Sequence, residues 1–299
     1  MLRTRLIVGA SLIAALAALG WLDHRAALPG AWLMPGLVVF TLLATRELLA
    51  LFAAKGLAPV AAVVYAGNLL IVLSPWAARE VVGVELAGAS ARASGAAELT
   101  LGALAVAVAL VLLAEMARYQ GPGRIVENLG TAAFALVYLG LMLSFAVRLR
   151  LEWGIGALAS LVVVVKMGDT GAYFCGKAFG RHRMSPRLSP SKTLEGAVGA
   201  VVFSALASWA VFQWLVPVAT NPGQVAKGSG SALPSLGYGV LLGLVGMVGD
   251  LAESLLKRDA ACKDSSSWIP GLGGVLDMLD SILLAAPVAF ACWRFGWIG

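Results

Sequence analysis

Residues 98–117 read ELTLGALAVAVALVLLAEMA, an apolar run of about the 20 residues that an α-helix needs to cross a bilayer. The apolarity is continuous rather than alternating, and an open sheet edge cannot be satisfied in lipid, so strands are disfavoured. Eight further runs share this character, at 6–22, 31–53, 59–76, 129–147, 153–174, 194–218, 233–256 and 276–297. We therefore expect an all-α fold, a polytopic bundle of about nine transmembrane helices.

The composition excludes a soluble globular domain. Of 299 residues, 60% are hydrophobic and 13% are charged, whereas soluble proteins carry about 25% charged residues. Cys175, Cys262 and Cys292 are too few and too scattered for a disulfide framework or a zinc site, and are interpreted as packing residues. His24 and His182 have no ligand-like spacing and are interpreted as loop residues. The first apolar run resembles a signal peptide, but the runs that follow favour a retained helix.

The basic residues divide the loops into two sides. We expect about five spans in 1–150 and four in 151–299, the latter with cytoplasmic loops at 175–193 and 257–276. Segments 78–97 and 219–232 are interpreted as surface loops without a motif. The N-terminal side collects fourteen Lys and Arg residues and the opposite side six or seven. Because cytoplasmic loops are enriched in Lys and Arg, we expect a cytoplasmic N-terminus.

A first polar cluster surrounds the loop at 175–193. Lys166, Asp169 and Tyr173 share one helical face, and an Asp within an apolar span usually faces a cavity or the bundle interior. The segment 189–193 supplies hydroxyls and a cation before a predicted helix N-terminus, which suits phosphate oxygens; its candidates are Ser189, Ser191, Lys192 and Thr193. A plain basic loop with a helix cap remains the alternative.

A second polar cluster joins the last two spans. On the eighth predicted helix one arc carries Asp250, Glu253, Ser254 and Lys257, and the ninth carries Asp277, Asp280 and Ser281 one turn inside the membrane. Two helices joined by a short loop are antiparallel neighbours, so the acidic faces can meet. Carboxylates brought together repel unless a proton or a cation lies between them, and oxygen-only ligands favour Mg²⁺. The alternative is a buried salt-bridge network between Asp250 or Glu253 and Lys257.

Residues 254–280, SLLKRDAACKDSSSWIPGLGGVLDMLD, resemble the signature of the phosphatidate cytidylyltransferases, also called CDP-diacylglycerol synthases. The stretch 169–173 (DTGAY) and the stretch 189–196 (SPSKTLEG) resemble a second block of that family. The motif-bearing similarity covers about residues 165–282. Two positions depart from the family pattern, since Leu272 replaces a usual His and Met278 a usual Arg. Every acidic position of the signature remains, so we favour an active variant over an inactive one.

The resemblance implies a Mg²⁺-dependent transfer of a cytidylyl group from CTP to phosphatidate, with release of pyrophosphate, in phospholipid biosynthesis. We expect a multi-pass protein of the cell inner membrane with its site facing the cytoplasm and no nucleic-acid partner. A second cation and a homodimer are left open. The expected metal ligands are Asp250, Asp277, Asp280 and Glu253; the expected catalytic residues are Lys192, Lys257, Arg258, Lys263 and Asp264; the expected substrate-binding residues are Asp169, Tyr173, Ser189, Ser191, Thr193, Ser254, Gly273 and Gly274.

Three other functions compete with this interpretation. A related CTP-dependent polyprenol or lipid kinase would release a nucleoside diphosphate rather than pyrophosphate. A catalytically silent paralogue is suggested by Leu272 and Met278. An ion-coupled transporter would also carry intramembrane acids, but those acids would lie near the midplane rather than at one end of the spans.

Overall fold

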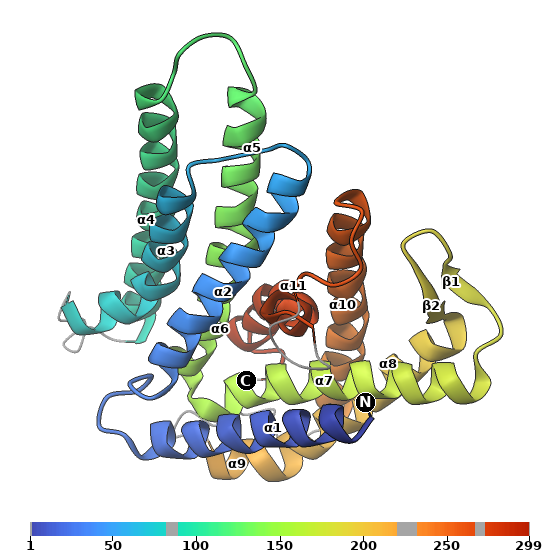
Figure 1. Ribbon diagram of the computed structural model, residues 1–299. Helices are drawn as coiled ribbons and strands as arrows, with labels where there is room; N and C mark the ends of the chain where they lie inside the picture. The colour runs from blue at the N-terminus through green and yellow to red at the C-terminus, as the bar shows by residue number, and fades with distance from the viewer. Residues whose placement is uncertain (1, 82–88, 220–231, 267–272, 299) are drawn as a thin grey trace. The chain divides into compact units, whose positions relative to one another are not determined.

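The computed structural model describes residues 2–81, 89–219, 232–266 and 273–298, and most of them are helical (Figure 1). Within these ranges, eight helical segments are long and apolar enough to cross a membrane. The predicted all-α, polytopic fold is confirmed. The helices are α1 (Leu2–Arg25), α2 (Leu33–Ala54), α3 (Ala61–Val81), α4 (Ala89–Ala117), α5 (Ile125–Ala135), α6 (Met142–Trp153), α7 (Ile155–Phe179), α8 (Leu194–Ala210), α9 (Val216–Ala219), α10 (Ala232–Asp259) and α11 (Val275–Arg294).

Several helices extend beyond their apolar runs. α7 continues through residues 175–179, which we expected to open a loop, and α10 continues to Asp259, so Lys257 and Arg258 lie on a helix. The loop expected at 78–97 is wrong at both ends, because α3 reaches Val81 and α4 begins at Ala89. Alanine-rich sequence favours helix also outside the apolar stretch. Of the loop expected at 219–232, residues 220–231 lie outside the described residues.

Two of the spans contain a π-helical turn. The segment η2 (Leu136–Leu141) joins α5 to α6, and η3 (Val211–Leu215) joins α8 to α9. The fifth and seventh predicted spans are therefore the continuous segments Ile125–Trp153 and Leu194–Ala219. A π-turn shifts the side chains that follow it to a different face, so apolar periodicity alone cannot fix which residues face inward.

The chain forms two compact units. The first comprises the described parts of 1–152 and 264–278, and the second those of 153–263 and 279–299. In the first unit, fully buried apolar side chains form the core, among them Leu48, Ile71, Leu136 and Leu139. A buried ion pair, Arg150 Nε to Asp23 Oδ2 at 2.6 Å, joins α6 to the end of α1.

The second unit is packed through small residues. A Cβ atom on Gly171 of α7 would lie 2.6 Å from the Gly199 carbonyl oxygen of α8, so these two helices approach as closely as their backbones allow. The close packing of α7, α8 and α10 leaves the loop after α7 outside the helical core. There, β1 (Arg183–Ser185) and β2 (Ser189–Thr193) form an antiparallel hairpin, and the second strand leads directly into α8.

Candidate active site

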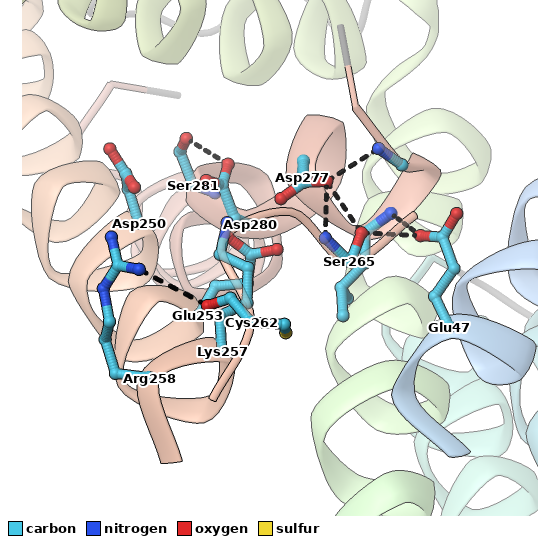
Figure 2. Close-up of polar contacts among 12 residues, drawn as sticks. Glu47, Asp250, Glu253, Lys257, Arg258, Cys262, Ser265, Asp277, Asp280 and Ser281 are labelled. Atoms are coloured by element: carbon cyan, nitrogen blue, oxygen red, sulfur yellow. Dashed lines mark hydrogen bonds and ion pairs between the residues drawn. The ribbon is translucent and has the colours of Figure 1, made fainter. Parts of the chain in front are cut away.

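Three carboxylates of the second unit converge at one point. Asp250 and Glu253 lie on successive turns of α10, and Asp280 lies on α11; one oxygen of each lies within 4.8 Å of the others (Figure 2). Glu253 is fully buried and Asp280 is 7% exposed. We call Asp250, Glu253 and Asp280 the carboxylate triad. The two acidic arcs read from the sequence thus do meet, through three of the four residues expected to bind metal.

A glycine permits this approach. A Cβ atom on Gly249 would lie 2.5 Å from the backbone carbonyl oxygen of Asp280 and 3.1 Å from the Cα atom of Ser281. Any side chain at this position would therefore push α10 away from α11. Because Gly249 directly precedes Asp250, the packing of the two helices and the spacing of the triad depend on the same contact.

Each member of the triad has a lysine beside it. Lys192 Nζ lies 2.7 Å from Asp250 Oδ2, Lys257 forms an ion pair with Glu253, and Lys166 Nζ lies 3.9 Å from Asp280 Oδ1. The Glu253–Lys257 pair is the salt bridge that the sequence left as an alternative, and it is present together with the carboxylate cluster. The lysines come from β2, α10 and α7, so the charge balance of the site is assembled from distant parts of the chain.

A hydrogen-bond network supports Asp280. Lys166 Nζ donates to Asp169 Oδ2 at 2.9 Å, and the Ser281 hydroxyl lies 3.1 Å from Asp169 Oδ2 and 2.7 Å from Asp280 Oδ1. Asp169 is thus next to the triad rather than in it. Four carboxylates with three lysines leave this group with one formal negative charge. Lys166 and Ser281 were visible in the sequence as polar residues of the two helical faces but were assigned no role.

The hairpin brings Lys192 to the triad and caps α8. Ser189–Thr193, expected as a phosphate-binding turn, is a strand; Ser191 is exposed and Ser189 half-buried. The Thr193 hydroxyl accepts from Gly196 N at 3.1 Å, so the predicted helix start is confirmed. Arg258 Nε donates to the Leu188 carbonyl oxygen at 3.0 Å, which ties the end of α10 to the hairpin.

The remaining predicted residues of the second unit lie around this centre. Ser254 is buried on α10, and Lys263 is exposed after that helix. The Tyr173 ring is 58% exposed and carries Lys177 Nζ at 5.7 Å from its centroid. Their roles toward substrate stay predictions, as does that of Asp264, which is exposed in the first unit.

Asp277 lies in the first unit and caps the start of α11. Its Oδ2 atom accepts from Gly274 N at 2.6 Å, from Ser265 N at 3.2 Å and from Ser265 Oγ at 2.7 Å. A Cβ atom on Gly273, which has φ of 85°, would lie 2.7 Å from the same oxygen. Gly273 and Gly274 therefore serve this cap by close backbone approach, and the ligand role expected for Asp277 stays a prediction.

Glu47 of α2 was not identified from the sequence. Its carboxylate is 3% exposed and accepts from Val275 N at 3.0 Å, Leu276 N at 2.7 Å and two serine hydroxyls (Figure 2). The signal was available, since Glu47 is the one acidic residue within the apolar run of α2, and intramembrane acids are functional candidates by default.

Comparison with known proteins agrees with the motif. Phosphatidate cytidylyltransferase of Pseudomonas aeruginosa is 40% identical over 143 residues, 48% of this chain and 49% of that protein. The enzyme of the same name from Helicobacter pylori is 42% identical over 136 residues, 45% and 46% of the two chains. The uncharacterized protein YnbB of Escherichia coli is 37% identical over 135 residues, 45% and 41% of the two chains.

The chain thus spans about half the length of the curated relatives it matches. The family model described as "Cytidylyltransferase family" extends much further, from residue 3 to residue 295. Of the two departures from the motif, Leu272 lies outside the described residues, and Met278 is half-buried on α11. The resemblance read from residues 254–280 is confirmed, and the chain belongs to the cytidylyltransferase family.

Proposed function

We propose that the protein is a phosphatidate cytidylyltransferase, which converts CTP and phosphatidate to CDP-diacylglycerol and pyrophosphate. The observation that carries the proposal is the carboxylate triad with Lys166, Lys192 and Lys257 around it. The names of the relatives from Pseudomonas aeruginosa and Helicobacter pylori support the choice of reaction. A site of buried acids and cations suits the joining of two polyanionic substrates.

The triad fits a divalent cation. Its donors are oxygens, two of the three residues are buried, and the oxygens are close enough to share one ion. Asp250, Glu253 and Asp280 would hold Mg²⁺, which supplies Lewis-acid charge neutralisation at phosphate oxygens. Asp169, Lys166 and Ser281 would keep Asp280 in place, because a hydrogen-bonded partner orients a ligating carboxylate.

The remaining chemistry is positioning and charge stabilisation. An oxygen of the lipid phosphate attacks the α-phosphorus of CTP, a new P–O bond forms, and the bond to the bridging oxygen breaks to release pyrophosphate. The attacking phosphate is already anionic, so a strong general base is not required. Lys192, at the more exposed edge of the triad, would contact the triphosphate, and Lys257 would hold the Glu253 carboxylate in its orientation.

The membrane supplies the second substrate. The multi-pass helical fold keeps the site beside the bilayer, so the acyl chains of phosphatidate can remain in lipid while its phosphate reaches the triad. We infer a cytoplasmic orientation of the triad from the Lys and Arg distribution, and a location in the cell inner membrane from the multi-pass helical fold and the bacterial relatives. The same basic loops would concentrate anionic lipid near the site.

The test is an assay of the purified protein with CTP, phosphatidate and Mg²⁺. CDP-diacylglycerol and pyrophosphate should form in equal amounts, and Asp280→Asn should lower kcat by about 100-fold or more, the scale expected when a group acting only on the transition state is lost. Asp259→Asn changes an exposed acid of α10 outside the triad and should leave the rate unchanged.

The products separate the competing functions. Release of CDP with a phosphorylated lipid would show the related kinase instead. A folded protein that yields neither product, under conditions where a relative is active, would show a silent paralogue.

A further inference from the structure

Glu47 is a buried carboxylate for which the proposed mechanism has no role. Its hydrogen-bond donors come from two places close to the start of α11. Oε1 accepts from Val275 N at 3.0 Å and from Ser266 Oγ at 2.5 Å; Oε2 accepts from Leu276 N at 2.7 Å and from Ser265 Oγ at 3.1 Å. All of these residues belong to the first unit. A side chain of α2 therefore holds a segment that is more than 200 residues later in the chain.

The contact satisfies a helix start that would otherwise lack partners. Val275 and Leu276 are the first two residues of α11, and backbone N–H groups there have no intrahelical acceptor. A carboxylate at a helix N-terminus is also favoured by the helix dipole, and hydrogen bonds to an ionised acceptor are the strong ones. Ser265 Oγ additionally lies 2.7 Å from Asp277 Oδ2, so Glu47 and Asp277 share the hydroxyl of Ser265.

The fit around Glu47 is tight. A Cβ atom on Gly274 would lie 2.5 Å from Glu47 Oε2, so a larger residue here would require the Glu47 carboxylate to shift. The Glu47 side chain, the hydroxyls of Ser265 and Ser266 and the first turn of α11 thus form one assembly with little room to shift. Residues 267–272, between the serines and Gly273, lie outside the described residues.

We propose that Glu47 is a positioning residue for the reaction, which it serves by fixing the first turn of α11. Asp280 lies on the same helix, three residues after Asp277. Without acceptors for its first N–H groups the first turn of α11 would fray, and Asp280, which lies in the turn that follows, would lose the regular helical backbone that holds its carboxylate beside Asp250 and Glu253. The proposal rests on the proposed function only for the chemistry that Asp280 performs.

The decisive variant is Glu47→Gln, which keeps the shape of the side chain but removes its charge and points an NH₂ group at N–H and O–H donors. Glu115→Gln is the matched control, because Glu115 is a buried acid of the same unit, 2% exposed, whose partner is Arg118. Three quantities are compared in the purified full chain: amide hydrogen exchange of the 273–280 segment, affinity for Mn²⁺ by electron paramagnetic resonance, and kcat.

We expect Glu47→Gln to speed exchange at Val275 and Leu276 and to weaken Mn²⁺ binding and kcat by about tenfold, the lower end of the range for residues that support metal ligands. KM for CTP should change less than kcat. Glu115→Gln should match the wild type in hydrogen exchange, Mn²⁺ affinity and kcat. Exchange, Mn²⁺ affinity and kcat all within twofold of the control would overturn the proposal. If Glu47→Gln does not fold, Ser266→Ala serves as the test, because it removes one hydroxyl donor to Glu47. We expect smaller changes in hydrogen exchange, Mn²⁺ affinity and kcat in the same direction. No change in any of the three would contradict the role of Glu47.

The outcomes distinguish this proposal from the proposed function. A wild-type protein that produces no CDP-diacylglycerol would refute the reaction, but hydrogen exchange would still show whether Glu47 anchors α11. Conversely, if the wild type is active and Glu47→Gln matches it in exchange, Mn²⁺ affinity and kcat, the proposed reaction is supported and the positioning role of Glu47 is refuted.

Discussion

At the scale of single residues, the three lysines of the site differ in surroundings and hence in expected role. Lys257 is 13% exposed and its partner Glu253 is fully buried, whereas Lys192 and Asp250 are 20% and 34% exposed. Removing one partner of a buried ion pair leaves an uncompensated charge, while a partly exposed pair can be solvated by water. The same substitution should therefore reduce mainly stability at Lys257 and mainly catalysis at Lys192.

Lys257→Met should lower the free energy of unfolding by about 3–5 kcal/mol, because the fully buried Glu253 loses its ion pair with Lys257. Lys192→Met should unfold near the wild-type temperature but show a lower kcat and a higher KM for CTP, since a phosphate partner is lost. Thermal unfolding in detergent and steady-state kinetics measure the two effects. A Lys257→Met protein as stable as the wild type would contradict this division.

At the scale of elements, the separation of α10 and α11 is set by Gly249. The nearest atoms to its missing Cβ are backbone atoms of Asp280 and Ser281, which cannot rotate away as a flexible side chain could. The two helices that carry the triad must therefore move apart if this position gains even a methyl group. The contact lies within the second unit and does not involve the loop between the helices.

Gly249→Ala should reduce activity by at least about tenfold and destabilise the protein by about 1–3 kcal/mol, the range for an overpacked core. Gly102→Ala in α4 is the control, because nothing lies within 4 Å of the Cβ that it would add. That control should be neutral or slightly stabilising, since alanine is the better helix former. Equal behaviour of the two variants, in kcat and unfolding temperature, would show that the helices tolerate separation.

At the scale of the whole molecule, the distribution of charge predicts which loops face the cytoplasm. The hairpin residue Arg187 belongs to the basic side and Ala27, after α1, to the opposite side; both are exposed. In a background with Cys175, Cys262 and Cys292 replaced by alanine, Ala27→Cys should react with an impermeant maleimide in intact cells. Arg187→Cys should react only after permeabilisation. The reverse pattern would invert the topology and place the triad outside the cytoplasm.

The sequence by itself determined the helical membrane fold, the approximate spans, the family and the two acidic arcs that meet in the triad. These follow from local properties, because a long apolar run must satisfy its backbone as a helix in lipid and polar residues three or four apart share a helical face. The ends of α3, α4, α7 and α10 were not predictable from apolarity, since helix propensity carries them beyond the apolar runs.

Only the tertiary structure decided which charged groups meet. Glu47 accepts hydrogen bonds from the backbone of Val275 and Leu276. Lys192 of the hairpin pairs with Asp250. Asp277 caps α11, whereas Asp280 belongs to the triad. Asp277 and Asp280 look equivalent in the sequence, one helical turn apart. Their different partners arise because hydrogen-bond donors and ion-pair partners far away in the chain are brought to each carboxylate by packing, which no local pattern encodes.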